Sequence, residues 1–201
     1  MKKTERVYRE IVLNSLGGRD TVLQRDLASR CGVSIGLVNK VVRKLELARS
    51  LEATPRGVRI LSPARVLNLW AAQRLISQDI VDSFRFDPIS KLATELMPSF
   101  IVTGCHAWSI LQRSRPAEYS DIYFYTGARR EYSSWRARRR IRKTNPNVFA
   151  LKHDDPHLLQ TSSKGLAPVP QMYVDIYSAG GPWAAPFLKD IAEKFPSLGM
   201  W

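Results

Sequence analysis

The 201-residue sequence predicts an α+β fold, with a basic helical region at residues 1–62 followed by a mixed α/β region at residues 63–201. Three observations lead to this fold class. Apolar residues recur at helical spacing up to Leu47, and a Pro-Arg-Gly turn then joins two short strand-like segments. Beyond Pro63, strand-like and helix-like runs are interleaved, which is typical of α/β and α+β domains.

Composition and charge exclude several classes of protein. Hydrophobic residues make up 44% of the chain and charged residues 24%, as in ordinary globular domains, so a disordered chain is not expected. The net charge of +13 favours a polyanionic partner, either a nucleic acid or an acidic surface. Much of this charge lies in residues 1–66, where 14 basic and 6 acidic side chains give +8.

The location predicted from the sequence is the cytoplasm. No apolar run is long enough to span a membrane, and no apolar segment follows the charged N-terminus as in a secretory signal, so no membrane partner is expected. The two cysteines, Cys31 and Cys105, match no metal-binding or disulfide pattern and are interpreted as small buried hydrophobic residues. The sequence therefore predicts no metal site and no cofactor.

Apolar spacing predicts three helices in the first region, at residues 5–16, 23–31 and 35–47. Glycines follow the first two, and Ser34 is a suitable N-cap for the third. The third helix has one apolar face, made by Val38, Val41, Val42 and Leu45. Strand-like segments at 50–54 and 58–61 then flank the turn Pro55-Arg56-Gly57.

Residues 24–43 resemble a helix-turn-helix motif, with the small Ala28 where two helices cross closely and Gly32 at the turn between them. Together with the predicted hairpin, the first region resembles a winged helix. The resemblance implies that the helix at 35–47 enters the major groove of DNA. In the alternative interpretation, the domain contacts another protein and its basic face is merely solvated.

Nine residues of this region are the predicted DNA contacts: Ser34, Gly36, Asn39, Lys40, Arg43, Lys44, Arg49, Arg56 and Arg59. Gly36 would let the helix backbone approach DNA closely, because it carries no side chain. Asn39 can pair with adenine through two hydrogen bonds, and Arg43 can bind guanine or a phosphate. Arg56, at the tip of the hairpin, can contact a phosphate or the minor groove.

The second region is expected to contain both helices and strands. Helices are predicted at 63–70, where the helix could serve as a connector, and at 89–97, 107–112 and 182–195. Strands are predicted at 100–104, 122–125, 148–151 and 172–177.

Three short segments resemble the core of minimal nucleotidyltransferases: Thr103-Gly104-Cys105-His106-Ala107, Ser120-Asp121-Ile122-Tyr123 and Val174-Asp175. Those enzymes hold a triphosphate at a glycine-containing turn and two metal ions with three carboxylates. Asp121 would be the first carboxylate and Asp175 the third, but Tyr123 occupies the second position. The resemblance therefore implies a degenerate, non-catalytic scaffold in which Asp121 and Asp175 cap turns or pair with arginines. Nucleotidyl transfer remains the enzyme alternative.

The order of these features along the chain resembles the AbiEi-type antitoxins of type IV toxin–antitoxin systems. The resemblance includes the first region, the segment Gln171-Met172-Tyr173-Val174-Asp175-Ile176 and the alanine-containing last helix. It implies a transcriptional regulator that represses its own operon and binds double-stranded DNA as a homodimer on two related half-sites. It also implies a paired toxin that is a nucleotidyltransferase.

A basic run at residues 129–143 holds eight cationic residues: Arg129, Arg130, Arg136, Arg138, Arg139, Arg140, Arg142 and Lys143. Tyr132 and Trp135 lie between them, and arginine with aromatic side chains suits phosphate contact and stacking on unpaired bases. Three roles remain open, namely extension of the DNA contacts, RNA binding, and contact with an acidic partner protein. The alternative is a solvated basic surface over buried Trp135 and Ile141.

Overall fold

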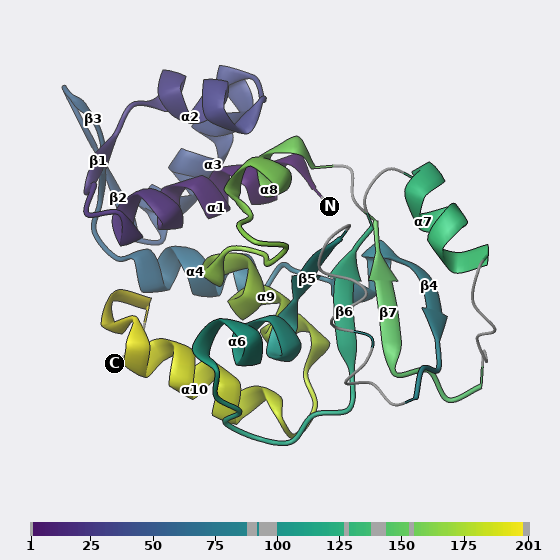
Figure 1. The fold of residues 1–201 in the computed structure, drawn as a ribbon. Helices are drawn as coiled ribbons and strands as arrows, with labels where there is room; N and C mark the ends of the chain where they lie inside the picture. The colour runs from purple at the N-terminus through teal and green to yellow at the C-terminus, as the bar shows by residue number, and fades with distance from the viewer. Residues whose placement is uncertain are drawn as a thin grey trace.

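The computed structural model describes residues 2–87, 92, 100–126, 129–137, 144–152 and 155–198. Two small sheets and the helices around them form a mixed α+β fold, as the sequence predicts. Figure 1 shows one sheet toward each side of the molecule, with most of the helices between them. Among the described residues, no helix is long and apolar enough to cross a membrane.

The N-terminal part of the chain consists of three helices and a three-stranded antiparallel sheet. The helices are α1 (Lys3–Leu16), α2 (Gln24–Cys31) and α3 (Ile35–Leu47), and the strands are β1 (Thr21–Val22), β2 (Leu51–Thr54) and β3 (Gly57–Ile60). The strand order is β1-β3-β2. The three predicted helices and the hairpin β2–β3 are confirmed. Strand β1 was not predicted, because two residues are too few to form a pattern.

Local interactions in this part fix the ends of α2 and α3. Gly32 ends α2 with a φ of 60°, in the left-handed region that favours glycine. Ser34 is the N-cap of α3, and its Oγ accepts a hydrogen bond from the Leu37 amide at 3.3 Å. The predicted apolar face of α3 is buried: Val38, Val41, Val42 and Leu45. Gly57 is required where β3 meets β1, since a Cβ there would lie 2.7 Å from the Val22 carbonyl oxygen.

Among the described residues, the rest of the chain supplies eight helical segments and a four-stranded mixed sheet. The helical segments are α4 (Pro63–Ala71), the 3-10 helix η1 (Ile76–Asp79), α6 (Gly104–Gln112), α7 (Arg129–Ala137), α8 (Pro156–Thr161), α9 (Val169–Ala179), α10 (Ala184–Lys194) and the 3-10 helix η2 (Pro196–Leu198). The strands are β4 (Ile80–Phe84), β5 (Ile101–Thr103), β6 (Ile122–Tyr125) and β7 (Val148–Leu151), in the order β4-β7-β6-β5. The central pair β6–β7 is parallel, and both outer pairs are antiparallel.

Most of the predicted elements of this region are confirmed, although the sequence did not predict β4, α7 and α8. The helix predicted at 89–97 falls outside the described residues except for Leu92, which is helical and buried. The strand predicted at 172–177 is wrong, because these residues lie within α9. Prolines occupy the N-terminal end of this helix, where a missing amide hydrogen costs nothing, and Gly180 follows its last turn.

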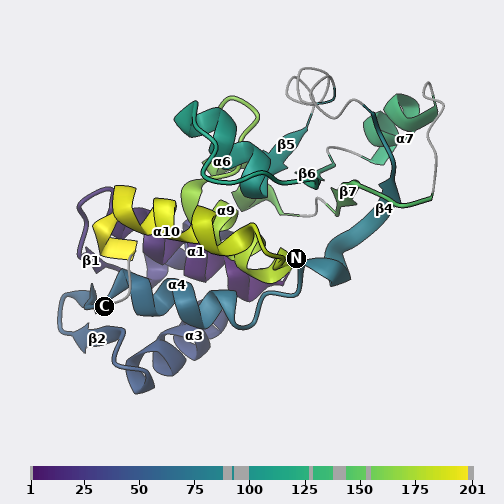
Figure 2. The same cartoon turned by 90° about the horizontal axis from the view of Figure 1, so that it is seen from below.

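Two clusters of buried side chains form the core, and α4 and α9 join the regions that surround them. Leu67 and Trp70 of α4 pack with the side chains of α1, α2 and α3, and Figure 2 shows α4 running beside α1. In α9, Val174 belongs to this first cluster, whereas Met172 and Ile176 belong to the cluster around the second sheet. Helix α4 is therefore an integral part of the core. The domain boundary at residue 62 stays a prediction.

Candidate nucleic-acid interface

The solvent face of α3 carries an unpaired polar and basic group of side chains. Asn39, Lys40 and Arg43 are exposed, whereas the opposite face of the helix is buried. Within the described residues, none of these three side chains makes a hydrogen bond or an ion pair. Burial of the apolar face holds the helix in place, so these side chains are positioned on a rigid element and remain available to an external partner.

Gly36, in the first turn of α3, has no structural reason to be glycine. Its φ is not positive, and a Cβ at this position would meet no atom within 4 Å. Glycine in a helix costs up to about 1 kcal/mol relative to alanine. The helix therefore pays a small stability cost at an exposed position, where the missing side chain leaves its backbone accessible from outside.

The other predicted DNA contacts differ in whether their side chains have a partner inside the protein. Arg56 is exposed at the turn between β2 and β3 and has no partner among the described residues. Arg59 is paired across the sheet, where its Nε donates to Glu52 Oε2 at 2.9 Å. Lys44 Nζ donates to Gln73 Oε1 at 2.7 Å, which directs it toward the end of α4.

Two further predicted contacts have roles in local structure. Ser34 caps α3, so its hydroxyl oxygen already accepts a hydrogen bond. Arg49 has a φ of 52° just after α3, and its carbonyl oxygen accepts a hydrogen bond from Arg65 at 3.4 Å. The predicted set therefore divides into exposed residues without internal partners, namely Gly36, Asn39, Lys40, Arg43 and Arg56, and residues with a role inside the fold.

The basic run at residues 129–143 is described in part. Its first half forms α7, which lies far from the sheet β1-β3-β2 in both views (Figures 1 and 2). Arg136 Nε donates to Asp82 Oδ2 at 2.8 Å, and its guanidinium lies over the Phe84 ring at 5.1 Å. Arg129 and Arg130 are the first two residues of α7. The remaining cationic positions lie outside the described residues: Arg138, Arg139, Arg140, Arg142 and Lys143.

The two aromatic residues of this run are in the core, so the predicted stacking on bases is wrong for them. Trp135 and Tyr132 are buried and pack against the Phe100 and Phe124 rings. The Tyr132 hydroxyl also donates to Asp82 Oδ2 at 2.7 Å. These contacts agree with the alternative interpretation, in which Trp135 is buried beneath a basic surface. Ile141 lies outside the described residues.

The two carboxylates of the nucleotidyltransferase resemblance already have hydrogen-bond partners inside the protein. Asp175 lies on α9 and has no exposed surface. It accepts hydrogen bonds from Arg74 Nε at 2.9 Å, Thr103 Oγ1 at 2.8 Å and the Tyr125 hydroxyl at 2.6 Å. The expectation that Asp175 pairs with an arginine is confirmed. Asp121 accepts from the Ser120 hydroxyl at 2.8 Å.

Both cysteines and His106 are uncharged near neutral pH. Burial raises the pKa of the Cys31 and Cys105 thiols to about 12, so neither is a thiolate near neutral pH. Both cysteines are buried, as predicted. Burial, together with the nearby Arg115 charge, lowers the pKa of His106 to about 4. The described residues contain no group of three or more histidine, cysteine, aspartate or glutamate side chains that could hold a metal ion.

A buried polar network joins α1 to α8 and α9, and no pattern in the sequence indicated it. Arg9 is completely buried, and donates to Asp155 Oδ2 at 2.9 Å and to Gln171 Oε1 at 2.8 Å. Its Nη1 also lies 3.0 Å from His157 Nδ1. Because a guanidinium can only donate, His157 Nδ1 accepts, and the ring proton is on Nε2, 2.9 Å from Glu10 Oε2.

Glu10 is the end of this network nearest the surface. Burial raises the pKa of Glu10, but hydrogen bonds from His157, Asn14 and Arg30 outweigh that effect, so the net shift is downward. Glu10 is therefore a stable carboxylate whose charge is compensated inside the protein.

Comparison with known proteins identifies no family. No family model, curated protein sequence or solved structure matches this chain. The functional assignment therefore rests on the chain's own geometry, above all on the exposed face of α3.

Proposed function

We propose that this protein is a sequence-specific DNA-binding transcriptional regulator that inserts α3 into the major groove. The observation that carries the proposal is the face of α3 where Asn39, Lys40 and Arg43 are exposed and have no partner among the described residues. The order of helices and strands from α1 to β3 resembles a winged helix, in which this helix is the one that reads bases.

The chemistry of the exposed residues fits this role. An asparagine can pair with adenine through two hydrogen bonds, and an arginine can do so with guanine. Asn39 and Arg43 supply these two groups on the same face, and Gly36 allows the helix backbone to approach the groove. Arg56 at the hairpin turn is suited to a phosphate or to the minor groove. The net charge of +13 adds long-range attraction to DNA.

The enzyme alternative has less support. Nucleotidyl transfer by two metal ions needs carboxylate oxygens that are free to bind them. Both oxygens of Asp175 already accept hydrogen bonds from buried groups, and Tyr123 occupies the position of the second carboxylate. RNA or protein binding through residues 129–143 also has less support, since Trp135 and Tyr132 are buried and Arg136 is paired with Asp82.

A narrower form of the proposal is an AbiEi-like antitoxin that represses its own operon as a homodimer. The order of a winged-helix-like part followed by an α/β part favours it, as does the Thr103-Gly104 junction between β5 and α6. The paired toxin would be a nucleotidyltransferase. An adjacent gene for such an enzyme is the expected result, and a neighbourhood without one would contradict the antitoxin role while leaving DNA binding untouched.

The test of DNA binding is selection of bound duplexes from a random pool at about 150 mM salt, with the full-length protein. We expect one enriched motif with the native protein and loss of that motif in the double variant Lys40→Ala/Arg43→Ala. The matched control is Lys189→Ala/Lys194→Ala, which removes two exposed lysine charges from α10 and should keep the motif. Absence of a motif, or its retention in the α3 variant, would contradict the proposal.

A further inference from the structure

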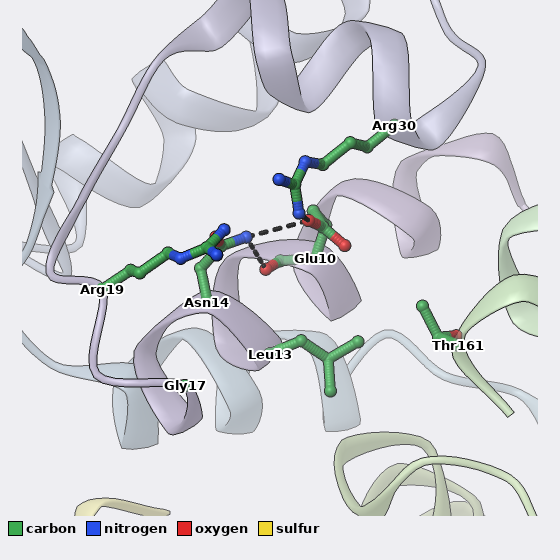
Figure 3. Close-up of a pocket in the computed structure, with 7 residues that line it drawn as sticks. All are labelled: Glu10, Leu13, Asn14, Gly17, Arg19, Arg30 and Thr161. Atoms are coloured by element: carbon green, nitrogen blue, oxygen red, sulfur yellow. Dashed lines mark hydrogen bonds and ion pairs between the residues drawn. The ribbon is translucent and has the colours of Figure 1, made fainter. Parts of the chain in front are cut away.

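A pocket of about 320 Å³ lies where α1, α2 and α8 come together. Figure 3 shows Arg19 and Arg30 reaching toward it from two sides, above Asn14 and Glu10 of α1. Thr161 of α8 lines its other side. Pockets that bind small ligands begin at about 300 Å³, so this pocket is large enough for a small metabolite.

The acidic group in the pocket is already neutralised by the protein. Glu10 Oε1 accepts hydrogen bonds from Asn14 Nδ2 at 2.9 Å and from Arg30 Nη1 at 3.2 Å. Its second oxygen pairs with the His157 ring at 2.9 Å. Because both carboxylate oxygens are engaged, the pocket offers little to a cation.

The positive groups of the pocket, in contrast, have unused donors. Arg19 is exposed, and no hydrogen bond or ion pair joins its side chain to the described residues. Arg30 is bound to Glu10 through Nη1, and 55% of its side-chain surface is exposed. Two guanidinium groups that converge on one hollow are suited to a carboxylate or phosphate group, because each can donate two parallel hydrogen bonds.

We propose that this pocket binds a small organic anion through Arg19 and Arg30. A second hollow of about 140 Å³ shares Asn14 and both arginines with it and continues between α2 and β1. Leu23 and Leu27 line this second hollow, and Leu13 lines the first. The arginines therefore stand between two partly apolar spaces, which suits an anion that also carries a carbon skeleton.

The position of the pocket connects it to both halves of the molecule. Arg30 lies on α2, which packs directly on α3, and Thr161 lies on α8. Glu10 also links the pocket to His157 and, through it, to Arg9. An anion that draws Arg30 away from Glu10 would change a contact between α1 and α2. An effect on DNA affinity follows if the proposed function holds, whereas binding of the anion itself does not depend on it.

Isothermal titration calorimetry on the full-length protein tests the site, with inorganic phosphate and succinate as separate probes at constant ionic strength. We expect at least one probe to bind, and Arg19→Gln and Arg30→Gln each to weaken that binding at least tenfold. Binding of one probe alone identifies the preferred anionic group. The matched control is Arg85→Gln, an exposed arginine just after β4 that lines neither hollow, which should change affinity less than twofold. No binding by either probe, or equal weakening in all three variants, would overturn the proposal.

A second measurement separates a metabolite site from a contact with the DNA backbone. On a duplex obtained by selection, the bound anion should change the DNA affinity of the native protein but not that of Arg19→Gln, and DNA should change anion affinity by the same factor. If instead Arg19→Gln lowers the salt dependence of DNA binding by about one phosphate contact, a slope change of about 0.9, the guanidinium binds DNA directly and the proposal is wrong.

Discussion

The arginines buried around α1 and α4 and those exposed on α3 and the hairpin have the same chemistry but opposite surroundings. Arg9 and Arg74 are almost completely buried, and each is paired with a carboxylate from a distant part of the chain, Asp155 and Asp175 respectively. Arg43 and Arg56 are exposed and have no partner in the part of the chain that the structure describes. Charge alone therefore does not tell arginines that hold the fold together from arginines that remain available to an external partner, whereas their internal contacts do.

The difference also predicts opposite consequences of mutation. Removal of one partner of a buried ion pair leaves the other charge without water or counter-charge, and this costs about 3–5 kcal/mol. Loss of an exposed charge usually changes stability by less than about 0.5 kcal/mol. The buried set should therefore control folding, and the exposed set should control binding.

The largest expected effect is that of Arg74→Met. This change removes the hydrogen bonds of Arg74 to Asp175 and Asp79 and leaves the buried Asp175 carboxylate without its counter-charge. We expect the free energy of unfolding, measured with urea, to fall by about 3–5 kcal/mol. The matched variant Arg43→Met should stay within about 0.5 kcal/mol of the native protein. A similar fall in the free energy of unfolding of both variants would show that buried and exposed arginines do not differ in their contribution to stability.

Asn39→Ala should have the next largest effect, and it concerns DNA rather than folding. Loss of a two-bond contact to a base should weaken binding to the best duplex by about 1–3 kcal/mol and relax the preference at one base pair. Titration of the selected duplex and of its single-base variants measures both quantities. Unchanged affinity and preference would show that α3 is not the helix that reads bases.

Gly36→Ala should change stability and binding in opposite directions. Because nothing lies within 4 Å of a Cβ at this position, alanine should raise the free energy of unfolding, by up to about 1 kcal/mol. The added methyl group should nevertheless weaken DNA binding if the helix backbone approaches the groove. Thermal unfolding measures the expected gain in stability, and a DNA-binding titration on the same sample measures the expected loss of affinity. A higher free energy of unfolding with unchanged DNA affinity would show that the backbone of α3 does not approach DNA at Gly36.

Arg56→Ala and Arg59→Ala should differ in a smaller but measurable way. Arg56 has no partner among the described residues, so its loss should reduce the slope of log affinity against log salt by about 0.9. Arg59 is paired with Glu52, and its loss should reduce the slope by less. Binding titrations at several salt concentrations give both slopes. A larger change for Arg59 would mean that its ion pair opens on DNA.

The local features of α3 were predictable, because they depend on neighbouring residues. The N-cap Ser34, the turn at Gly32 and the apolar face from Val38 to Leu45 follow from helical spacing and from residue conformational preferences. The exposed polar face follows from the same periodicity. This is why the candidate contacts Asn39 and Arg43 were found from the sequence.

Residues 172–177 were predicted as a strand but belong to helix α9. The prediction failed because this helix is buried on more than one side. Its run of Met172, Tyr173, Val174, Asp175, Ile176 and Tyr177 has no clear polar face, and a short run of this kind cannot be distinguished from a strand by periodicity. The ion pair of Arg74 with Asp175 spans 101 residues of sequence. Such pairings, and the pocket beside Glu10, depend on the tertiary fold and leave no local signal.

The sharing of α9 between the two cores has a consequence for biosynthesis. The cluster beneath α1, α2 and α3 includes Val174 and Leu198, which are synthesised long after these three helices. Chains grow from the N-terminus at about 5–20 residues per second, so the first three helices wait for several seconds before their core can be completed. A chain shortened by a premature stop codon before Val174 would lack these side chains, and we expect cellular proteases to remove it.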